Sequence, residues 1–156
     1  MARRRRAVPQ VMRMFMGEYS HTIDAKGRLI VPSKFREQLG DEFIVTKGLD
    51  GCLFAYDQNE WTTFEEKLKA LPITNANVRN FTRFMLGGAS ACEVDRQGRI
   101  LLPAPLRAFA HLEKEVVLVG VGNRIEIWNR AAWDERNNFN DNDMEAIAES
   151  MEGLGI

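Results

Sequence analysis

The sequence is poor in the features that mark membrane proteins and disulfide-stabilised proteins. Its longest apolar run, residues 116–121, spans six residues and includes a glycine, whereas a helix that crosses a bilayer needs about 20. The basic amino terminus has no apolar stretch of the kind found in a signal peptide. The two cysteines, Cys52 and Cys92, form no Cys-x-x-Cys motif and are interpreted as ordinary half-buried thiols. These absences predict a cytoplasmic protein without a membrane partner.

The residues that catalysis requires are also scarce. The only two histidines, His21 and His111, occupy unrelated contexts, and neither has a second metal ligand at a typical spacing. The glycines do not have the spacing of a phosphate-binding loop. The sequence therefore predicts a protein that is not an enzyme, holds no metal and needs no cofactor.

Basic residues are concentrated in three short segments of a chain whose formal net charge is only −1. Residues 1–13 contain five arginines and no acidic residue. Residues 24–36 contain four basic residues and one aspartate, and residues 95–107 contain three basic residues and one aspartate. The rest of the chain is acidic. These segments would attract a polyanion that the remainder would repel.

Two of the basic segments are copies of each other. Residues 24–32 (DAKGRLIVP) align with residues 95–103 (DRQGRILLP) at an offset of 71. The offset becomes 72 farther along, where Gly48 matches Gly120 and Trp61 matches Trp133. Similarity over roughly forty residues, with glycine and aromatic positions kept, predicts a tandem duplication.

Each copy predicts the same series of elements. An aspartate followed three residues later by glycine is typical of a tight turn between two paired strands, and Pro32 and Pro103 suit the first turn of a short helix. Further strands are expected at 42–46, 52–56, 115–119 and 124–128, with turns at 47–50 and 120–123. Apolar residues at helical spacing predict helices at 59–71 and 75–86 and from Trp133 towards Gly153. The aromatic residues of these helices are expected to pack in the core: Trp61, Phe64, Phe81, Phe84 and Trp133.

The duplicated Asp-x-x-Gly-Arg turn is the strongest functional candidate. A single copy would be explained as a stable hairpin with an internal Asp–Arg pair. Two copies, at equivalent positions in basic segments of an otherwise acidic chain, favour an anion-binding role. The planar guanidinium group forms paired hydrogen bonds with phosphate or guanine, and a two-stranded ribbon fits the major groove of DNA. Arg28 and Arg99 are therefore candidate DNA contacts, while Asp24 and Asp95 shape the turns.

The same residues resemble those of a known family. Residues 21–36 (HTIDAKGRLIVPSKFR) and 95–103 resemble the paired DxxxR segments of the MraZ family, bacterial transcriptional regulators with two tandem SpoVT/AbrB-type domains, and the resemblance extends from Met14 to about Met151. It implies an α+β fold in which two tandem SpoVT/AbrB-like β-hairpin modules form a swapped-hairpin-type barrel with flanking helices. It also implies binding of double-stranded DNA at repeated operator sites upstream of the division and cell-wall gene cluster, by a ring-shaped homo-oligomer associated with the nucleoid. Carried over to this sequence, the DNA-binding positions are Asp24, Lys26, Arg28, Asp95, Arg96 and Arg99.

The repeat and the resemblance together predict five segments: a basic, disordered leader at 1–13, a first module at 14–61, connecting helices at 62–88, a second module at 89–133, and a C-terminal helix and tail at 134–156. The leader has no counterpart in the family pattern, and Met14 is an alternative natural start. The alternative function is a non-DNA oligomeric scaffold or regulatory barrel. Its acidic surface would bind protein partners, and its turns would serve only as assembly contacts.

Overall fold

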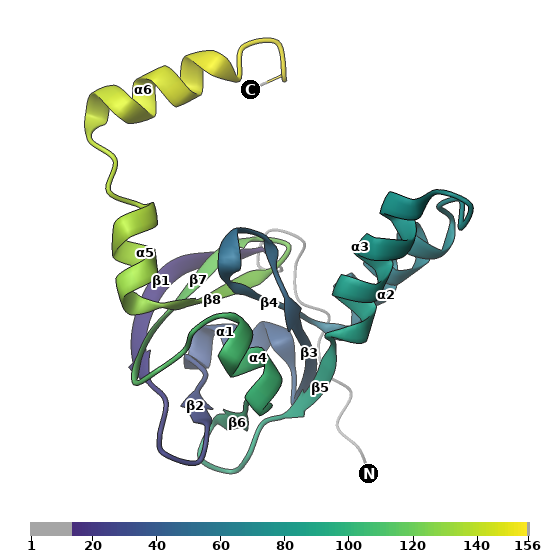
Figure 1. Cartoon of the computed structure of the whole chain (residues 1–156). Helices are drawn as coiled ribbons and strands as arrows, with labels where there is room; N and C mark the ends of the chain where they lie inside the picture. The colour runs from purple at the N-terminus through teal and green to yellow at the C-terminus, as the bar shows by residue number, and fades with distance from the viewer. Residues whose placement is uncertain (1–13, 156) are drawn as a thin grey trace.

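The computed structural model describes residues 14–155, so the predicted leader at residues 1–13 lies outside the described residues. The chain has a mixed α+β fold (Figure 1). The first copy forms β1 (Phe15–Thr22), β2 (Arg28–Ile30), α1 (Ser33–Leu39), β3 (Glu42–Lys47), the 3-10 helix η2 (Leu49–Gly51) and β4 (Leu53–Tyr56). Helices α2 (Gln58–Lys69) and α3 (Ala76–Gly87) follow. The second copy forms β5 (Ser90–Glu93), β6 (Arg99–Leu101), α4 (Ala104–Phe109), β7 (Glu115–Gly122) and β8 (Ile125–Asn129), followed by α5 (Arg130–Arg136) and α6 (Asp141–Ser150).

The two copies are interleaved in one antiparallel sheet. The order of the six-stranded sheet is β1-β7-β8-β4-β3-β5. β1 pairs with β7 from Phe15 opposite Gly122 to Thr22 opposite Glu115, and β5 pairs with β3. The first strand of each copy is thus hydrogen-bonded to the third strand of the other, while β4 and β8 pair at the centre. β2 and β6 form a separate two-stranded ribbon that also joins the copies. The six-stranded sheet is open, with β1 and β5 as its edge strands.

The pairing corrects the predicted hairpin between the strands that flank each Asp-x-x-Gly turn. The turn forms and is closed by a hydrogen bond from the amide of Asp24 to the carbonyl of Arg28 (3.0 Å), but beyond it the two strands share only an isolated bridge between Ile23 and Leu29. The reason is that the flanking backbone bonds to the second copy. The amide of Ile23 donates to the carbonyl of Lys114 (2.8 Å), and the amide of Val31 donates to the carbonyl of Gly98 (2.9 Å). The backbone on both sides of the turn is therefore paired with the other copy.

The turn predicted at residues 120–123 forms between β7 and β8 but is shifted by about one residue, because β7 continues to Gly122 and β8 begins at Ile125. A Cβ atom at Gly120 would clash with the backbone nitrogen of Met16, so the glycine allows β1 to approach β7 closely. The chain reverses between Val121 and Arg124, where the amide of Val121 donates to the carbonyl of Arg124 (3.0 Å).

The other predicted strands and helices are confirmed, with ends shifted by at most a few residues. α1 and α4 begin directly after Pro32 and Pro103. The side chain of Asp57 caps α2 by accepting from the amide of Glu60, and Asn75 caps α3 in the same way, which satisfies amides that have no partner within the helix. The C-terminal helical stretch is divided into α5 and α6.

Two apolar clusters stabilise the sheet. The first lies between the sheet, the β2–β6 ribbon and the helices α1 and α4, and includes Leu29, Phe35, Phe43, Ile100 and Leu106. The second lies where α2, α3 and α5 meet the sheet, and includes Phe54, Tyr56, Met85 and Trp128. The aromatic residues predicted to pack in the core all lie against this second cluster: Trp61, Phe64, Phe81, Phe84 and Trp133.

Both cysteines are fully buried rather than half-buried as predicted. Solvent does not reach them, because Cys52 belongs to the second apolar cluster and Cys92 belongs to the first. Burial raises the pKa of both thiols, that of Cys92 to about 11. Neither thiol is ionised near neutral pH, so neither is reactive in the folded protein.

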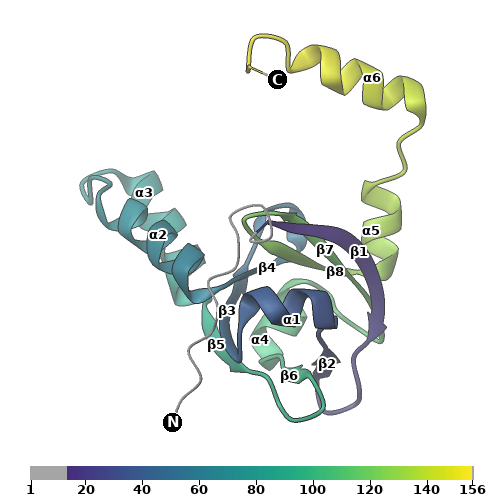
Figure 2. The same cartoon turned by 180° about the vertical axis from the view of Figure 1, so that it is seen from behind.

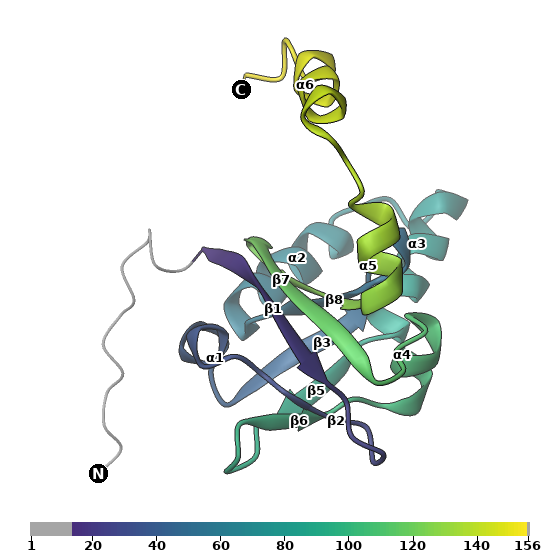
Figure 3. The same ribbon diagram turned by 90° about the vertical axis from the view of Figure 1, so that its left-hand side faces the viewer.

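The helices extend from the sheet in different directions. The α2–α3 pair projects from one side, while α5 packs at the opposite side and α6 leads away from the body (Figures 1 and 2). The loops that join β1 to β2 and β5 to β6 lie at the end of the molecule opposite to α6 (Figure 3). Within residues 14–155, every helix is too short or too polar to cross a membrane.

Candidate nucleic-acid interface

The first turn is organised by the carboxylate of Asp24. Its Oδ1 accepts hydrogen bonds from the amides of Lys26 and Arg28, both at 2.9 Å, and its Oδ2 accepts one from Nε of Arg28 at 2.6 Å. The amide of Gly27 donates to the carbonyl of Asp24 at 3.0 Å, and Gly27 has a φ of 85°, which favours glycine. Asp24 therefore fixes both the turn and the orientation of the Arg28 guanidinium.

The second turn repeats this geometry. Oδ1 of Asp95 accepts from the amides of Gln97 and Arg99, both at 2.9 Å, and Oδ2 accepts from Nε of Arg99 at 2.9 Å. Gly98 has a φ of 77°. The sequence repeat is thus also a repeat of hydrogen bonds.

These hydrogen bonds stabilise the ionised carboxylates. The pKa values of Asp24 and Asp95 are lowered from the ordinary 3.8, mainly by the backbone amides of Arg28 and Arg99 and further by the guanidinium groups of the same residues. At neutral pH each turn therefore presents a guanidinium that is held by an ionised carboxylate.

The β2–β6 ribbon places the two arginines on one outward face. The central residues of the two strands, Leu29 and Ile100, pair with each other and are at most 1% exposed. Because side chains alternate along a strand, the neighbours of these core residues point outward. They form what we call the ribbon face: Arg28, Ile30, Arg99 and Leu101. Ile30 is 45% and Leu101 59% exposed, so the ribbon face combines two guanidinium groups with two exposed apolar side chains. Sequence reasoning missed these two apolar residues, although the alternation around Leu29 and Ile100 could have identified them.

Two further arginines connect each turn to the other copy. The guanidinium of Arg107, in α4, lies against Gly27, and that of Arg36, in α1, lies against Gly98. A Cβ atom at either glycine would be 2.7 Å from a guanidinium atom. Each of these arginines also donates from Nε, at 3.0 Å, to a backbone carbonyl five residues earlier. Sequence reasoning gave these two arginines no role, although their equivalent positions in the repeat were visible.

The two turns lie close enough to act together. Nη1 of Arg99 is 4.0 Å from Oδ2 of Asp24 in the other turn, and Figures 1 and 3 show both loops at one end of the molecule. The side chains of Arg28 and Arg99 are 34% and 25% exposed, so they are held in place rather than extended into solvent. The structure thus brings together four of the predicted site residues. The other two, Lys26 and Arg96, are exposed within the turns.

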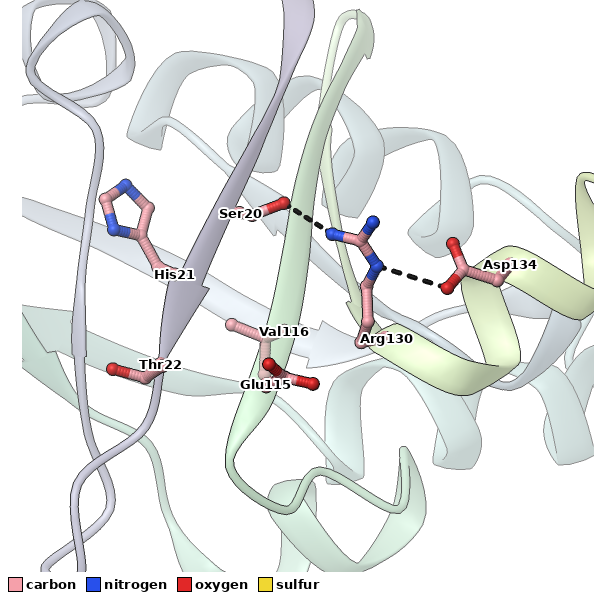
Figure 4. Close-up of a pocket in the computed structure, with 7 residues that line it drawn as sticks. All are labelled: Ser20, His21, Thr22, Glu115, Val116, Arg130 and Asp134. Carbon is pink, nitrogen blue, oxygen red and sulfur yellow. Dashed lines mark hydrogen bonds and ion pairs between the residues drawn. The ribbon is translucent and has the colours of Figure 1, made fainter.

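A polar hollow of about 430 Å³ lies beside β1, β7 and α5 (Figure 4). Arg130 donates there to the Ser20 hydroxyl at 2.7 Å and to the Asp134 carboxylate at 3.2 Å. His21 points away from these contacts (Figure 4), and Ser20 is bonded to a guanidinium rather than to a general base. In the described part of the chain, no three His, Cys, Asp or Glu side chains gather in a way that could hold a metal ion.

Comparison with known sequences decides the family. A family model described as "MraZ protein, putative antitoxin-like" matches the chain twice, at residues 14–84 and 85–153. The chain belongs to the MraZ family. Each MraZ match contains one Asp-x-x-Gly-Arg turn, so the two family domains correspond to the two copies.

Similar MraZ proteins carry the name "Transcriptional regulator MraZ". The protein of Desulforamulus reducens is 58% identical over 141 residues, which cover 90% of this chain and 99% of the relative. The proteins of Moorella thermoacetica and Thermoanaerobacter sp. (strain X514) are 57% and 55% identical over 143 residues, which cover 92% of this chain and all of each relative. The names of these relatives describe regulators rather than enzymes.

Proposed function

We propose that this protein is a transcriptional regulator that binds double-stranded DNA through the ribbon face and the two Asp-x-x-Gly turns. The observation that carries the proposal is the aspartate-held arginine, presented twice on one exposed two-stranded ribbon. The name of the relatives, Transcriptional regulator MraZ, supports it.

The aspartates prepare the arginines for paired hydrogen bonds. Since Nε of Arg28 is taken by Asp24, its two Nη groups, which form no hydrogen bond among residues 14–155, would be the ones to donate to DNA. Two Nη groups can donate together to O6 and N7 of guanine or to two phosphate oxygens. A side chain that is already held in place loses less conformational entropy on binding. The exposed Lys26 and Arg96 would add phosphate contacts from the turns.

The shape and the apolar residues of the ribbon face also suit DNA. A two-stranded antiparallel ribbon fits the major groove. Ile30 and Leu101 lie across the ribbon from the two arginines, where they would contact thymine methyl groups at neighbouring base pairs. The ribbon face would then read both guanine and thymine.

The proposal includes assembly. One protomer would hold DNA weakly, because the basic segments are short and the rest of the chain is acidic. A ring-shaped homo-oligomer would present several ribbon faces to repeated operator sites. Each later contact would become intramolecular and raise the affinity by ~10² to 10⁴-fold. The operator would lie upstream of the division and cell-wall gene cluster, and the protein would act in the cytoplasm at the nucleoid, without catalysis, metal or cofactor.

We also propose that the interleaved strands of the two copies correspond to the swapped-hairpin-type barrel of SpoVT/AbrB-like modules. The cross-copy pairs β1–β7 and β3–β5 support this assignment. Its module boundaries are 14–61 and 89–133, with connecting helices at 62–88 and a C-terminal segment at 134–156.

The test is a footprint on DNA upstream of the protein's own gene, followed by affinity measurements between about 50 and 200 mM salt. We expect a protected region, and an affinity whose logarithm falls linearly with the logarithm of the salt concentration, with a slope of about −0.9 per phosphate neutralised. A non-DNA scaffold would give no footprint and no salt-dependent affinity, and that result would favour the alternative function.

A further inference from the structure

We infer that helix α6 of one copy docks into an apolar groove between α2 and α3 of a second copy. The inference rests on the assembly included in the proposed function and names the two surfaces that would form it. It is carried by the exposure, shape and charge of these surfaces.

α6 is an amphipathic helix that leaves its apolar side in solvent. None of its residues is buried, and a capping box formed by Asn140 and Asp143 stabilises its first turn. Four apolar residues recur at positions i, i+3, i+4 and i+7 and form what we call the α6 stripe: Met144, Ile147, Ala148 and Met151. Met144 is 49% and Ile147 38% exposed. A helix with such a stripe is suited to bind a groove on another surface.

The α6 stripe is bordered by acidic residues. Residues 137–156 contain five acidic residues and no basic residue. At 3.6 residues per turn, Glu145, Glu149 and Glu152 all fall on one side of the stripe. The surface that receives α6 should therefore be apolar with basic residues along one border.

The groove between α2 and α3 has this character. It has a volume of about 440 Å³. Its apolar lining includes Leu71 and Ile73, which are 45% and 76% exposed, together with Val78. Its basic lining residues are Lys69, Arg79 and Arg83.

The two arginines of α3 are available for a partner. Both are exposed: Arg79 donates one hydrogen bond to the carbonyl of Ile73 at 3.0 Å and Arg83 one to Oδ1 of Asn80 at 3.2 Å, but neither forms an ion pair with another residue of the described range 14–155. α3 contains no acidic residue. Lys69, by contrast, is paired with Glu65 at 2.9 Å. The positive charge of Arg79 and Arg83 therefore complements the acidic border of α6.

The geometry favours a second copy over the same chain. α5 lies at the side of the sheet opposite to α2 and α3 (Figures 1 and 2), and it is fastened there by a hydrogen bond from Trp133 Nε1 to Glu18 at 3.0 Å and by the Arg136–Asp50 ion pair. Only residues 137–140 join α5 to α6, and four residues span at most about 14 Å. α6 therefore stays on the α5 side of its own protomer. A helix of one copy in the groove of the next is a head-to-tail contact, which can close into a ring.

The test uses full-length variants whose mass is measured by light scattering after gel filtration. Ile147→Asp places a charge in the α6 stripe, and Val78→Asp places one in the groove. The matched control is Ala146→Asp, which adds the same charge to the far side of α6. We expect each of the first two variants to weaken assembly by at least about tenfold, because a buried charge would be left unpaired, and we expect the control to assemble like the wild type. Circular dichroism checks that all three variants keep their fold.

Mixing the two defective variants distinguishes a second copy from the same chain. A pair formed by one Ile147→Asp protomer and one Val78→Asp protomer retains an intact α6 and an intact groove, so pairs should reappear on mixing. A charge exchange is the second measurement. Glu145→Lys with Glu149→Lys should weaken assembly, and combining them with Arg79→Glu and Arg83→Glu should restore it.

The outcomes separate this inference from the proposed function. If the wild type assembles and the Ile147→Asp and Val78→Asp variants assemble equally well, the docking of α6 is overturned while assembly stands. If both variants are monomeric and mixing restores no pairs, docking between copies is overturned. A wild type that stays monomeric at every concentration would instead overturn the assembly on which the inference rests.

Discussion

Replacing Gly27 by alanine tests how the first turn is connected to the second copy. Gly27 has a φ of 85°, and a Cβ atom there would lie 2.7 Å from Cζ of Arg107. Gly51 is the matched control, because it has a φ of 80° but no neighbouring atom within 4 Å of its Cβ position. The left-handed conformation alone costs an alanine about 1–2 kcal/mol, and this cost applies to both positions.

The two variants should differ by the cost of moving Arg107. Its Nε donates to the carbonyl of Leu102 at 3.0 Å, and losing such a hydrogen bond costs about 0.5–1.5 kcal/mol. We expect Gly51→Ala to lower the free energy of unfolding by about 1–2 kcal/mol and Gly27→Ala by about 1.5–3.5 kcal/mol. Urea denaturation followed by circular dichroism measures both losses. In a protein of this size, each kcal/mol corresponds to about 2–4 °C in Tm.

The Arg107→Ala background identifies the source of the difference. Without the guanidinium, Gly27→Ala should cost about as much as Gly51→Ala. Gly98 of the second turn and Arg36 of the first copy form the equivalent pair and should behave in the same way. Equal losses for Gly27→Ala and Gly51→Ala in the wild-type background would refute the idea that Arg107 braces the turn.

Three further predictions concern the ribbon face and the operator. Ile30→Ala and Leu101→Ala should each lower the affinity for operator DNA by about tenfold or less without changing its salt dependence, since no phosphate contact is removed; a shallower salt slope would contradict this. Because the pKa values of Asp24 and Asp95 are lowered in the folded protein, their stabilisation is present above the ordinary 3.8 and is lost as the pH falls through the lowered values. Urea denaturation should therefore show the Asp24→Asn, Asp95→Asn variant to be less stable than the wild type at about pH 6, with a difference that shrinks below about pH 4; a difference independent of pH would count against it. Shifting one operator repeat by about 5 base pairs, half of a ~10.5 base-pair turn, should reduce the affinity for two-repeat DNA to that for one repeat, whereas unchanged affinity would show that the repeats are bound independently.

The local chemistry of the turns could be predicted from the sequence because its determinants are close together in the chain. Asp24 accepts from Lys26 and Arg28, which are two and four residues away. The glycine at the fourth position and the proline before each short helix act equally locally. The hydrogen bonds within each turn therefore follow from the sequence, whereas the closeness of the two turns, with Arg99 4.0 Å from Asp24, is seen only in the structure.

The strand partners could not be predicted in this way. Alternation shows which side of a strand is buried but not which strand lies beside it. Two strands joined by a tight turn were expected to pair, yet β2 pairs with β6 of the other copy. The roles of Arg36 and Arg107 depend on this exchange, because each lies against a glycine of the opposite copy. Both arginines stood in the basic segments, but only the cross-copy pairing reveals what they contact.

The binding of DNA by the ribbon face is tested most directly by the affinity of the Arg28→Ala, Arg99→Ala double variant for the footprinted DNA. Each arginine that reads a base edge should contribute ~1–3 kcal/mol, so Kd should rise by about 5- to 150-fold per arginine. The control is Lys67→Ala, which removes an exposed positive charge from α2, away from the ribbon, and should leave Kd almost unchanged. A folded double variant that binds this DNA as tightly as the Lys67→Ala control would contradict the account.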